Sequence, residues 1–139
     1  DEEREFWDFL GDTTLTWDRK RLVKRQDKIY YLPQDFPEGA GLRYLRTGLF
    51  MGTVNKGRFE PSQAMAMVLG KDRYSNCVSF PREDERVVRY LKGETIALKE
   101  EEGPRTGWCL VCVDGFALGF AKGNQMMLKN KYYPGWRWQ

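Results

Sequence analysis

The residues best suited to chemistry gather near the C-terminal end of the 139-residue sequence, where cations alternate with aromatic rings. Residues 129–138 read Lys-Asn-Lys-Tyr-Tyr-Pro-Gly-Trp-Arg-Trp. Cationic side chains displace the counterions of a phosphate backbone, and aromatic planes stack on unpaired bases at about 1–3 kcal/mol per base. The pattern therefore predicts a surface for nucleic acid. Because the same rings could close the core instead, we expect some of them to point inward and others outward.

The placement of charge and aromatic rings nominates nine residues for contacts with nucleic acid. Contacts to phosphates are expected from Lys56, Arg58, Lys122, Lys129, Lys131 and Arg137. Stacking on bases, or packing beside them, is expected from Tyr132, Tyr133 and Trp136.

The pair Lys56 and Arg58 flanks a glycine shortly before Pro61, which we expect to be the first residue of a helix. A helix N-terminus attracts anions through its free N–H groups, so this turn is a candidate phosphate site. Glu60 weakens that interpretation, because its own carboxylate could occupy the helix end. A solvated turn before a capped helix is the alternative.

Two other cationic clusters are interpreted as ordinary solvated surface. Arg82, Arg86 and Arg89 share one face of a predicted helix, but a charged face opposite an apolar one is typical of any surface helix. They could otherwise form a ridge that contacts a phosphate backbone. The basic run from Arg19 to Arg25 suits a strand edge, where Lys and Arg prevent unwanted pairing.

Independent catalysis is not expected from this chain. It contains no histidine, which removes the commonest general base and every Ser-His or Cys-His nucleophile pair. Neither a phosphate-cradling G-x-x-x-x-G-K-[S/T] loop nor a G-x-G-x-x-G turn is present. Paired carboxylates could still act as acid and base, but the acidic runs at residues 83–85 and 100–102 look solvated. If a structure showed two carboxylates converging in a deep pocket, the chain would again be interpreted as a small enzyme.

The three cysteines are interpreted as buried core thiols in a reducing, cytoplasmic protein. Cys109 and Cys112 have CxxC spacing, but two residues three apart in a strand point to opposite faces. Three cysteines without histidine also cannot supply four soft ligands, so no metal is expected. No apolar run approaches the roughly 20 residues needed to cross a membrane. The net charge of +3 permits an acidic partner without requiring one.

The elements that must position these residues are mostly short strands. A helix is predicted over residues 3–10 and a hairpin over 21–24 and 28–32, turned at Gln26-Asp27. A Pro- and Gly-rich loop at residues 33–41 ends this appendage, which gives predicted domains of residues 1–41 and 42–139. Because the chain does not begin with Met, we expect it to be a piece of a longer protein, with processing of the N-terminus as the alternative.

In the second predicted domain, strands are expected at residues 42–45, 49–54, 95–98, 108–113, 116–121 and from 128. A helix buried on most sides is expected over 64–69 and another over about 83–91, capped by Gly93. Asp114-Gly115 predicts a tight hairpin, and the acidic loop at 100–107 should be exposed. This pattern indicates an α+β fold, mainly β, most simply a small closed or half-closed barrel.

Four stretches, taken together and in order, resemble a known family. They are GRFEPSQA at residues 57–64, YLKGET at 90–95, GWCLVCVDGFALG at 107–119 and LKNKYYPG at 128–135. The chain resembles the C-terminal region of the Sun-family ribosomal RNA cytosine-5 methyltransferases of the RsmF type. In that family a catalytic domain that uses S-adenosylmethionine (SAM) is followed by a small connecting domain and a PUA-like RNA-binding domain. The resemblance implies a PUA-like β-barrel over residues 42–139 and the connecting domain over 1–41.

The resemblance also implies which parts of such an enzyme are missing here. The catalytic cysteines of the family follow a proline, whereas Cys77, Cys109 and Cys112 follow Asn, Trp and Val. The SAM-binding loop has no counterpart, so the cofactor would belong to a catalytic domain outside this chain. Many relatives carry His where this sequence has Gln63 and Lys131, so any role of those histidines is lost.

The resemblance thus leads to an RNA-binding accessory region of a cytoplasmic methyltransferase. Its partners would be ribosomal RNA and the upstream catalytic domain, with neither a membrane nor a metal. A module that packs against the catalytic domain and orients it, without touching RNA, remains the alternative, since exposed Trp and Tyr also serve protein interfaces.

Overall fold

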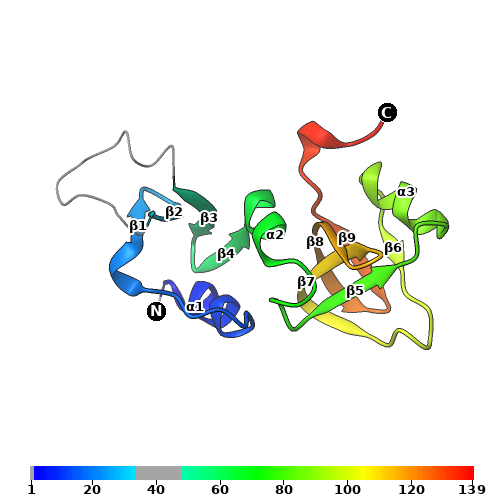
Figure 1. Ribbon diagram of the computed structural model, residues 1–139, viewed down its shortest axis with the longest axis horizontal. Helices are drawn as coiled ribbons and strands as arrows, with labels where there is room; N and C mark the ends of the chain where they lie inside the picture. The colour runs from blue at the N-terminus through cyan, green and yellow to red at the C-terminus, as the bar shows by residue number, and fades with distance from the viewer. Residues whose placement is uncertain (1, 34–47) are drawn as a thin grey trace. The chain divides into compact units, whose positions relative to one another are not determined.

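The computed structural model describes residues 2–33 and 48–139 (Figure 1). The chain divides into two compact units, one of Asp1–Gly11 with Leu15–Met65 and one of Asp12–Thr14 with Ala66–Gln139. The boundary predicted between residues 41 and 42, and the strand predicted at 42–45, lie outside the described residues. Both units consist mainly of strands with a few short helices, which confirms the predicted α+β, mainly β fold.

The first unit combines one helix with a four-stranded antiparallel sheet. In chain order its elements are α1 (Arg4–Gly11), a 3₁₀ turn (Arg19–Arg21), β1 (Leu22–Arg25), β2 (Lys28–Tyr31), β3 (Leu49–Asn55) and β4 (Arg58–Pro61). The strands lie in the order β1-β2-β3-β4, so the sheet is a simple meander (Figure 1). The predicted N-terminal helix and the hairpin turned at Gln26-Asp27 are both confirmed.

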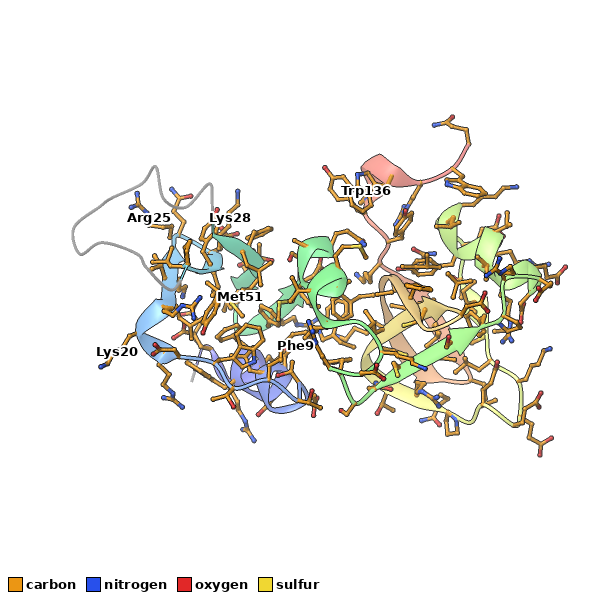
Figure 2. All side chains as sticks on the ribbon, viewed as in Figure 1. Phe9, Lys20, Arg25, Lys28, Met51 and Trp136 are labelled. Atoms are coloured by element: carbon orange, nitrogen blue, oxygen red, sulfur yellow. The ribbon has the colours of Figure 1, made fainter. Side chains whose placement is uncertain are left out.

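Aromatic packing joins α1 to this sheet. The predicted helix face is buried, with Phe6 and Phe9 each about 3% exposed or less. The rings of Phe6 and Phe9 lie 5.1 and 5.2 Å from the ring of Phe59 on β4. Figure 2 marks Phe9 and Met51, which both belong to this buried set. The helix thus covers one face of the sheet, and the other face is free to carry polar side chains.

Gly52 allows β3 to lie very close to β4. The pairing of β2 with β3 shifts register between Ile29 and Tyr30, which is a bulge close to Gly52. Gly52 has φ +155°, and a Cβ atom there would lie 2.3 Å from the backbone oxygen of Glu60. No side chain fits at that distance, so this position requires glycine.

The segment before the next helix differs from the prediction. Residues Arg58–Pro61 form β4, so Pro61 ends a strand instead of starting a helix. Helix α2 (Gln63–Leu69) follows, and the Ser62 hydroxyl accepts a hydrogen bond from the Met65 N–H at 3.0 Å. Only one side of α2 is buried, because Met67 and Val68 are 46% and 37% exposed.

The second unit is a five-stranded sheet with one principal helix. Its remaining elements are β5 (Cys77–Phe80), α3 (Glu85–Leu91), β6 (Ile96–Ala97), β7 (Arg105–Val113), β8 (Phe116–Gln125), β9 (Met127–Asn130) and a final 3₁₀ turn (Pro134–Trp136). The strand order is β5-β7-β8-β9-β6, and only β5 and β7 run parallel among these pairs. Strand β5 was not predicted, and β7 begins at Arg105, inside the segment expected to be an exposed loop. None of the helices in the described residues is long and apolar enough to cross a membrane.

Turn chemistry sets the ends of the main elements in this unit. Asp114 and Gly115 have φ values of 47° and 85°, as the tight β7–β8 turn requires. Helix α3 begins after Asp84, whose side chain accepts the Arg86 N–H. It ends at Gly93 (φ 88°), where the Gly93 N–H donates to Tyr90 and the Glu94 N–H to Arg89, the paired bonds of a Schellman motif. The predicted glycine cap is confirmed.

The Gly52→Ala substitution should destabilise the chain by about 2 kcal/mol or more, because the new methyl group must push β4 away from β3. Urea unfolding would measure the loss. Gly11→Ala is the matched control, since a Cβ at Gly11 meets no atom within 4 Å. Equal effects of the two substitutions would contradict the close approach at Gly52.

Candidate nucleic-acid interface

Three side chains form a row across the outer face of the second unit's sheet. Trp108 on β7 lies opposite Lys122 on β8, which lies opposite Lys129 on β9. Residues directly opposite each other in antiparallel strands point to the same face, so the three side chains are neighbours. The adjacent row, Cys109, Ala121 and Asn130, is buried on the other face.

The indole of Trp108 is the centre of this group. The Nζ atoms of Lys122 and Lys131 lie 5.0 and 5.9 Å from the centroid of its ring. Phe120 supports the indole from below at a centroid distance of 6.3 Å. We call Trp108, Lys122, Lys129 and Lys131 the Trp108 platform. It combines three of the predicted phosphate contacts around a half-buried ring.

The platform gathers positive charge on one side of the sheet. Lys122 and Lys129 are directly opposed, and like charges in that position destabilise a sheet. An anion between the two ammonium groups would remove the repulsion. Trp108 was not among the nine residues predicted to contact nucleic acid, although its neighbour Cys109 was expected in the core and adjacent residues of a strand point to opposite faces.

The aromatic tail splits between core and surface, as expected. Tyr132 is only 8% exposed, and its ring lies 5.2 Å from that of Tyr90. Tyr133 and Trp136 are about half exposed, with ring centroids 5.7 Å apart in an edge-to-face contact. Trp136, marked in Figure 2, belongs to the turn that follows β9. Of the three predicted stacking residues, Tyr133 and Trp136 present accessible rings.

Arg137 fastens the tail to the end of α3. Its Nε donates to the Tyr132 carbonyl at 3.2 Å, and its side chain covers Gly93 so closely that a Cβ there would be 2.6 Å from the Arg137 Cδ. The backbone N–H of the next residue, Trp138, donates to the Leu91 carbonyl at 2.8 Å. A cation is favoured beside a helix C-terminus, so this arginine has a structural task.

Asn130 is a buried polar residue that the sequence did not single out. Its Nδ2 donates to the carbonyls of Tyr90 at 2.8 Å and Glu94 at 2.9 Å, and its Oδ1 accepts the Tyr132 N–H. One amide thereby connects β9, the end of α3 and the start of the tail. Any interface that includes Tyr133 and Trp136 depends on this connection.

Lys56 and Arg58 lie in the first unit, where both are exposed. Lys56 and Gly57 form the tight β3–β4 turn, with φ values of 53° and 78°. The prediction that this turn leads directly into a helix N-terminus was wrong, because β4 separates the two. The anion site expected at that helix start therefore has no support, although Arg58 stays available on the sheet surface.

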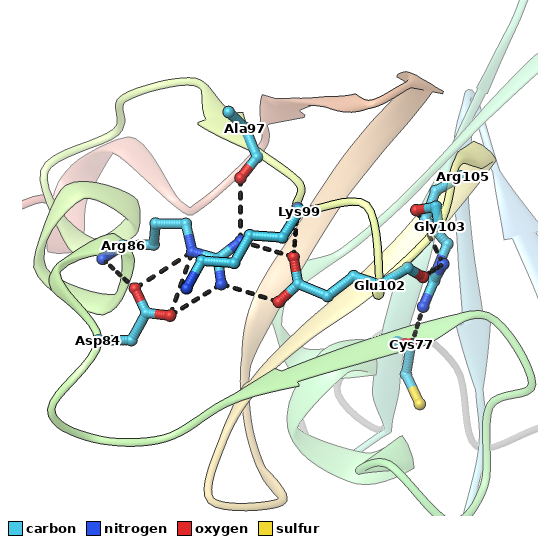
Figure 3. A network of polar contacts seen from close by, with 8 residues as sticks. All are labelled: Cys77, Asp84, Arg86, Ala97, Lys99, Glu102, Gly103 and Arg105. Atoms are coloured by element: carbon cyan, nitrogen blue, oxygen red, sulfur yellow. Dashed lines mark hydrogen bonds and ion pairs between the residues drawn. The ribbon is translucent and has the colours of Figure 1, made fainter.

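The three arginines predicted as one helix face have quite different surroundings. Arg86 is only 8% exposed, and its guanidinium pairs with Asp84 at 2.8 Å and with Glu102 at 2.7 Å (Figure 3). It also donates to the Ala97 carbonyl and lies 4.1 Å from the Phe80 ring centroid. Arg82 and Arg89 form exposed ion pairs with Asp114 and Glu85. A shared ridge of the three is excluded.

The two carboxylates that converge on Arg86 are structural. Their hydrogen bonds to the Arg86 side chain lower the pKa of Asp84 to about 2 and lower the pKa of Glu102. A general acid needs the opposite shift, so this cluster offers no acid–base pair. Glu102 also accepts the Lys99 N–H within the acidic loop, and its pair with Arg86 ties this loop to the helix (Figure 3).

Two of the three cysteines are core thiols as predicted, whereas Cys77 on β5 is only half-buried. Cys109 and Cys112 are fully buried, and burial raises the pKa of each thiol to about 12. Neither is therefore a nucleophile at neutral pH. Over residues 2–33 and 48–139, no cluster of three His, Cys, Asp or Glu side chains could hold a metal ion.

Comparison with known proteins assigns both parts of the chain to one family. Residues 8–69 match the first C-terminal domain of the RsmF rRNA methyltransferase, and residues 77–138 match the PUA domain of methyltransferase RsmF. The "Ribosomal RNA small subunit methyltransferase F" of Shewanella sp. (strain MR-7) is 27% identical over 128 residues. The protein of the same name from Shewanella baltica (strain OS195) is 27% identical over 124 residues. Each alignment covers 88% of this chain but only about a quarter of the relative, 26% and 25%.

Replacing Arg86 with Met should lower the free energy of unfolding by about 3 kcal/mol or more, because two partly buried carboxylates lose their partner. Arg82→Met, which breaks an exposed pair, should cost no more than about 1 kcal/mol. Chemical denaturation of both variants provides the comparison. Similar losses would show that Arg86 is no more important than a surface arginine.

Acid should weaken the fold through Asp84. Its pKa is about 2 in the folded chain against 3.8 in an unfolded one, so its stabilising effect is complete above about pH 4 and disappears toward pH 2. Asp84→Asn keeps a side chain suited to capping α3 but removes the charge. Its stability should therefore fall less than that of the original chain between pH 6 and pH 2, measured by urea unfolding. Parallel pH curves for the two proteins would refute this, and Asp114→Asn serves as the exposed control.

Proposed function

Since the chain belongs to the RsmF family of ribosomal RNA methyltransferases and carries the family's two C-terminal domains, we propose that it holds ribosomal RNA for a catalytic domain elsewhere in the same protein. The chain spans about a quarter of its relatives, so the methylation itself would take place outside it. The Trp108 platform carries this proposal, because it combines opposed lysines with an aromatic ring.

The platform suits an RNA backbone beside an unpaired base. Lys122 and Lys129 lie opposite each other across neighbouring strands, so one phosphate group between them could contact both. The Trp108 ring offers a surface for a base, with Lys131 close by. Phosphate contacts of this kind supply affinity without reading the sequence.

The other nominated residues take different parts in this proposal. Tyr133 and Trp136 present exposed rings to RNA, whereas Tyr132 and Arg137 hold the tail in position. Lys56 and Arg58 would contact RNA from the first unit. In this proposal, some of the nine nominated residues contact RNA, and the others hold those residues in position.

The chemistry is proposed to follow that of the family. A cytosine in ribosomal RNA would receive a methyl group at C5 from SAM, bound by the catalytic domain, in the cytoplasm. Nothing in the described residues suits that step, since both buried thiols have a raised pKa and the carboxylates beside Arg86 are paired. The chain's part would be to bind and orient the substrate.

Removing two lysines of the platform should weaken RNA binding in a salt-dependent way. For single-stranded RNA, log affinity falls with log salt by about 0.7 per phosphate contact, so Lys122→Ala with Lys129→Ala should flatten the slope by about 1.4. Filter binding or fluorescence anisotropy over a range of salt concentrations gives this slope. Trp108→Leu should cost about 1–3 kcal/mol of binding free energy with less change in slope.

The control is Lys71→Ala with Lys92→Ala, which removes the same charge from exposed positions of the second unit outside the platform. If both double variants change the slope equally, the platform is not the contact. If the chain binds RNA at no salt concentration tested, a module that only orients the catalytic domain becomes the better interpretation.

A further inference from the structure

The first unit has a second surface that combines aromatic rings with cations. The bulge between β2 and β3 places Tyr30 directly opposite Phe50. Their ring centroids lie 5.4 Å apart, with the planes inclined at 43°. Both residues are half-buried, so each ring retains accessible area. This pair is an aromatic patch on the sheet.

Cations lie next to the patch on the same face. Arg25 at the end of β1 pairs with Lys28 on β2, and Lys28 pairs with Thr53 on β3. Lys28 and Tyr30 are two residues apart in one strand, so they point to the same side. Figure 2 shows Arg25 and Lys28 near each other beside the β1–β2 turn. Both side chains are exposed.

Strand β4 adds a third cation to this face. Glu60 pairs with Thr53, so it shares the face, and Arg58 lies two residues from Glu60 in the same strand. Arg58 and Glu60 are exposed. Among the described residues of strands β1 to β4, this face carries the three cations Arg25, Lys28 and Arg58 and the carboxylate of Glu60. Its charge favours an anionic partner.

This arrangement is not needed to build the unit. The opposite face of the sheet supplies the core, with Ile29, Val54 and Phe59 each 2% exposed. Arg25 and Lys28 are like charges in direct opposition, which costs stability in a sheet. As on the Trp108 platform, a bound anion would relieve that repulsion.

We infer that the face formed by Arg25, Lys28, Tyr30, Phe50 and Arg58 is a second RNA-binding surface, which holds a single-stranded segment of the RNA. The inference rests on the proposed function for the identity of the partner, but it concerns a different unit and different residues. We call these five residues the Tyr30–Phe50 face. Cations hold the phosphates, and the two rings accept unpaired bases.

Two arguments favour single-stranded RNA as the occupant. Aromatic rings can stack only on bases that are not already stacked within a helix, and such bases occur in loops and single strands. The three cations of the face, Arg25, Lys28 and Arg58, also suit the phosphates that join such bases. Two RNA-binding surfaces on one chain also raise each other's effective concentration, so the pair would bind one long RNA more tightly than either surface alone.

A comparison of two neighbouring lysines tests the inference. Lys28 and Lys24 are both exposed and lie on paired strands, but Lys24 pairs with Ile29 and so points to the other face. The 139-residue chain would be titrated with a 20-nucleotide single-stranded oligouridine and with an RNA duplex of equal length. Lys28→Ala should lower the salt slope for the single strand by about 0.7, whereas Lys24→Ala should leave it unchanged.

The aromatic pair is tested by stacking and by cross-linking. Phe50→Leu and Tyr30→Leu should each lower affinity for the single strand by about fivefold or more, with duplex binding nearly unchanged. A thermal melt of each variant establishes that it is folded. Photocross-linking of a 4-thiouridine oligonucleotide, read by mass spectrometry, should mark peptides that contain Tyr30 or Phe50.

The possible outcomes separate the two proposals. One outcome overturns only the inference about the Tyr30–Phe50 face. In that outcome the Lys122/Lys129 double variant weakens RNA binding, Lys28→Ala has the same effect as Lys24→Ala, and no cross-link falls on β2 or β3. The proposed function then still stands. Equal losses from Lys24→Ala and Lys28→Ala would indicate general charge attraction and also overturn it. If neither RNA binds, the proposed function fails, and this inference fails with it.

Discussion

The register of β7, β8 and β9 is the constraint on which the second unit depends. The Asp114-Gly115 turn fixes where β8 begins, and the shift between Val111 and Cys112 adjusts the pairing beyond it. At the far end of this pairing, the row of Cys109, Ala121 and Asn130 faces the core, and the row of Trp108, Lys122 and Lys129 faces the other side. A slip of one residue would bury Lys122 and expose Ala121, so the apolar core and the Trp108 platform are determined together.

Buried polar groups then hold α3 and the tail in place. Arg86 fastens the start of the helix to β6 and the acidic loop, while Asn130 fastens its end to β9. Both groups are satisfied by several hydrogen bonds, as burial of charge or amide requires. Arg86 and Asn130, which the sequence alone could suggest as ligand contacts, therefore stabilise the fold. Through Asn130 they also fix the start of the tail that carries exposed rings such as Trp136.

Local signals in the sequence were enough for much of the fold. Asp114-Gly115 predicted the main hairpin, and Gly93 the end of α3, because positive φ at these positions is a property of a few residue types. Strand β5 was missed since its partner β7 lies about thirty residues away and pairs in parallel. The burial of Arg86 could not be predicted from the sequence either. It depends on an ion pair with Glu102, which lies 16 residues away in an acidic run that was expected to be solvated. Likewise, the cations of the tail were predicted, but their grouping around Trp108 required the register.

Each of the two units has a surface that combines cations with aromatic rings, but a different feature of the fold produces it in each. In the second unit the pairing of β8 with β9 opposes Lys122 and Lys129, and in the first unit a bulge opposes Tyr30 and Phe50 beside Arg25 and Lys28. In both, part of one sheet face carries cations and rings, at the cost of like charges placed together. A polyanion with unpaired bases would offset that cost. The same physical argument therefore supports RNA contacts from both units, and it assigns the apolar faces to folding.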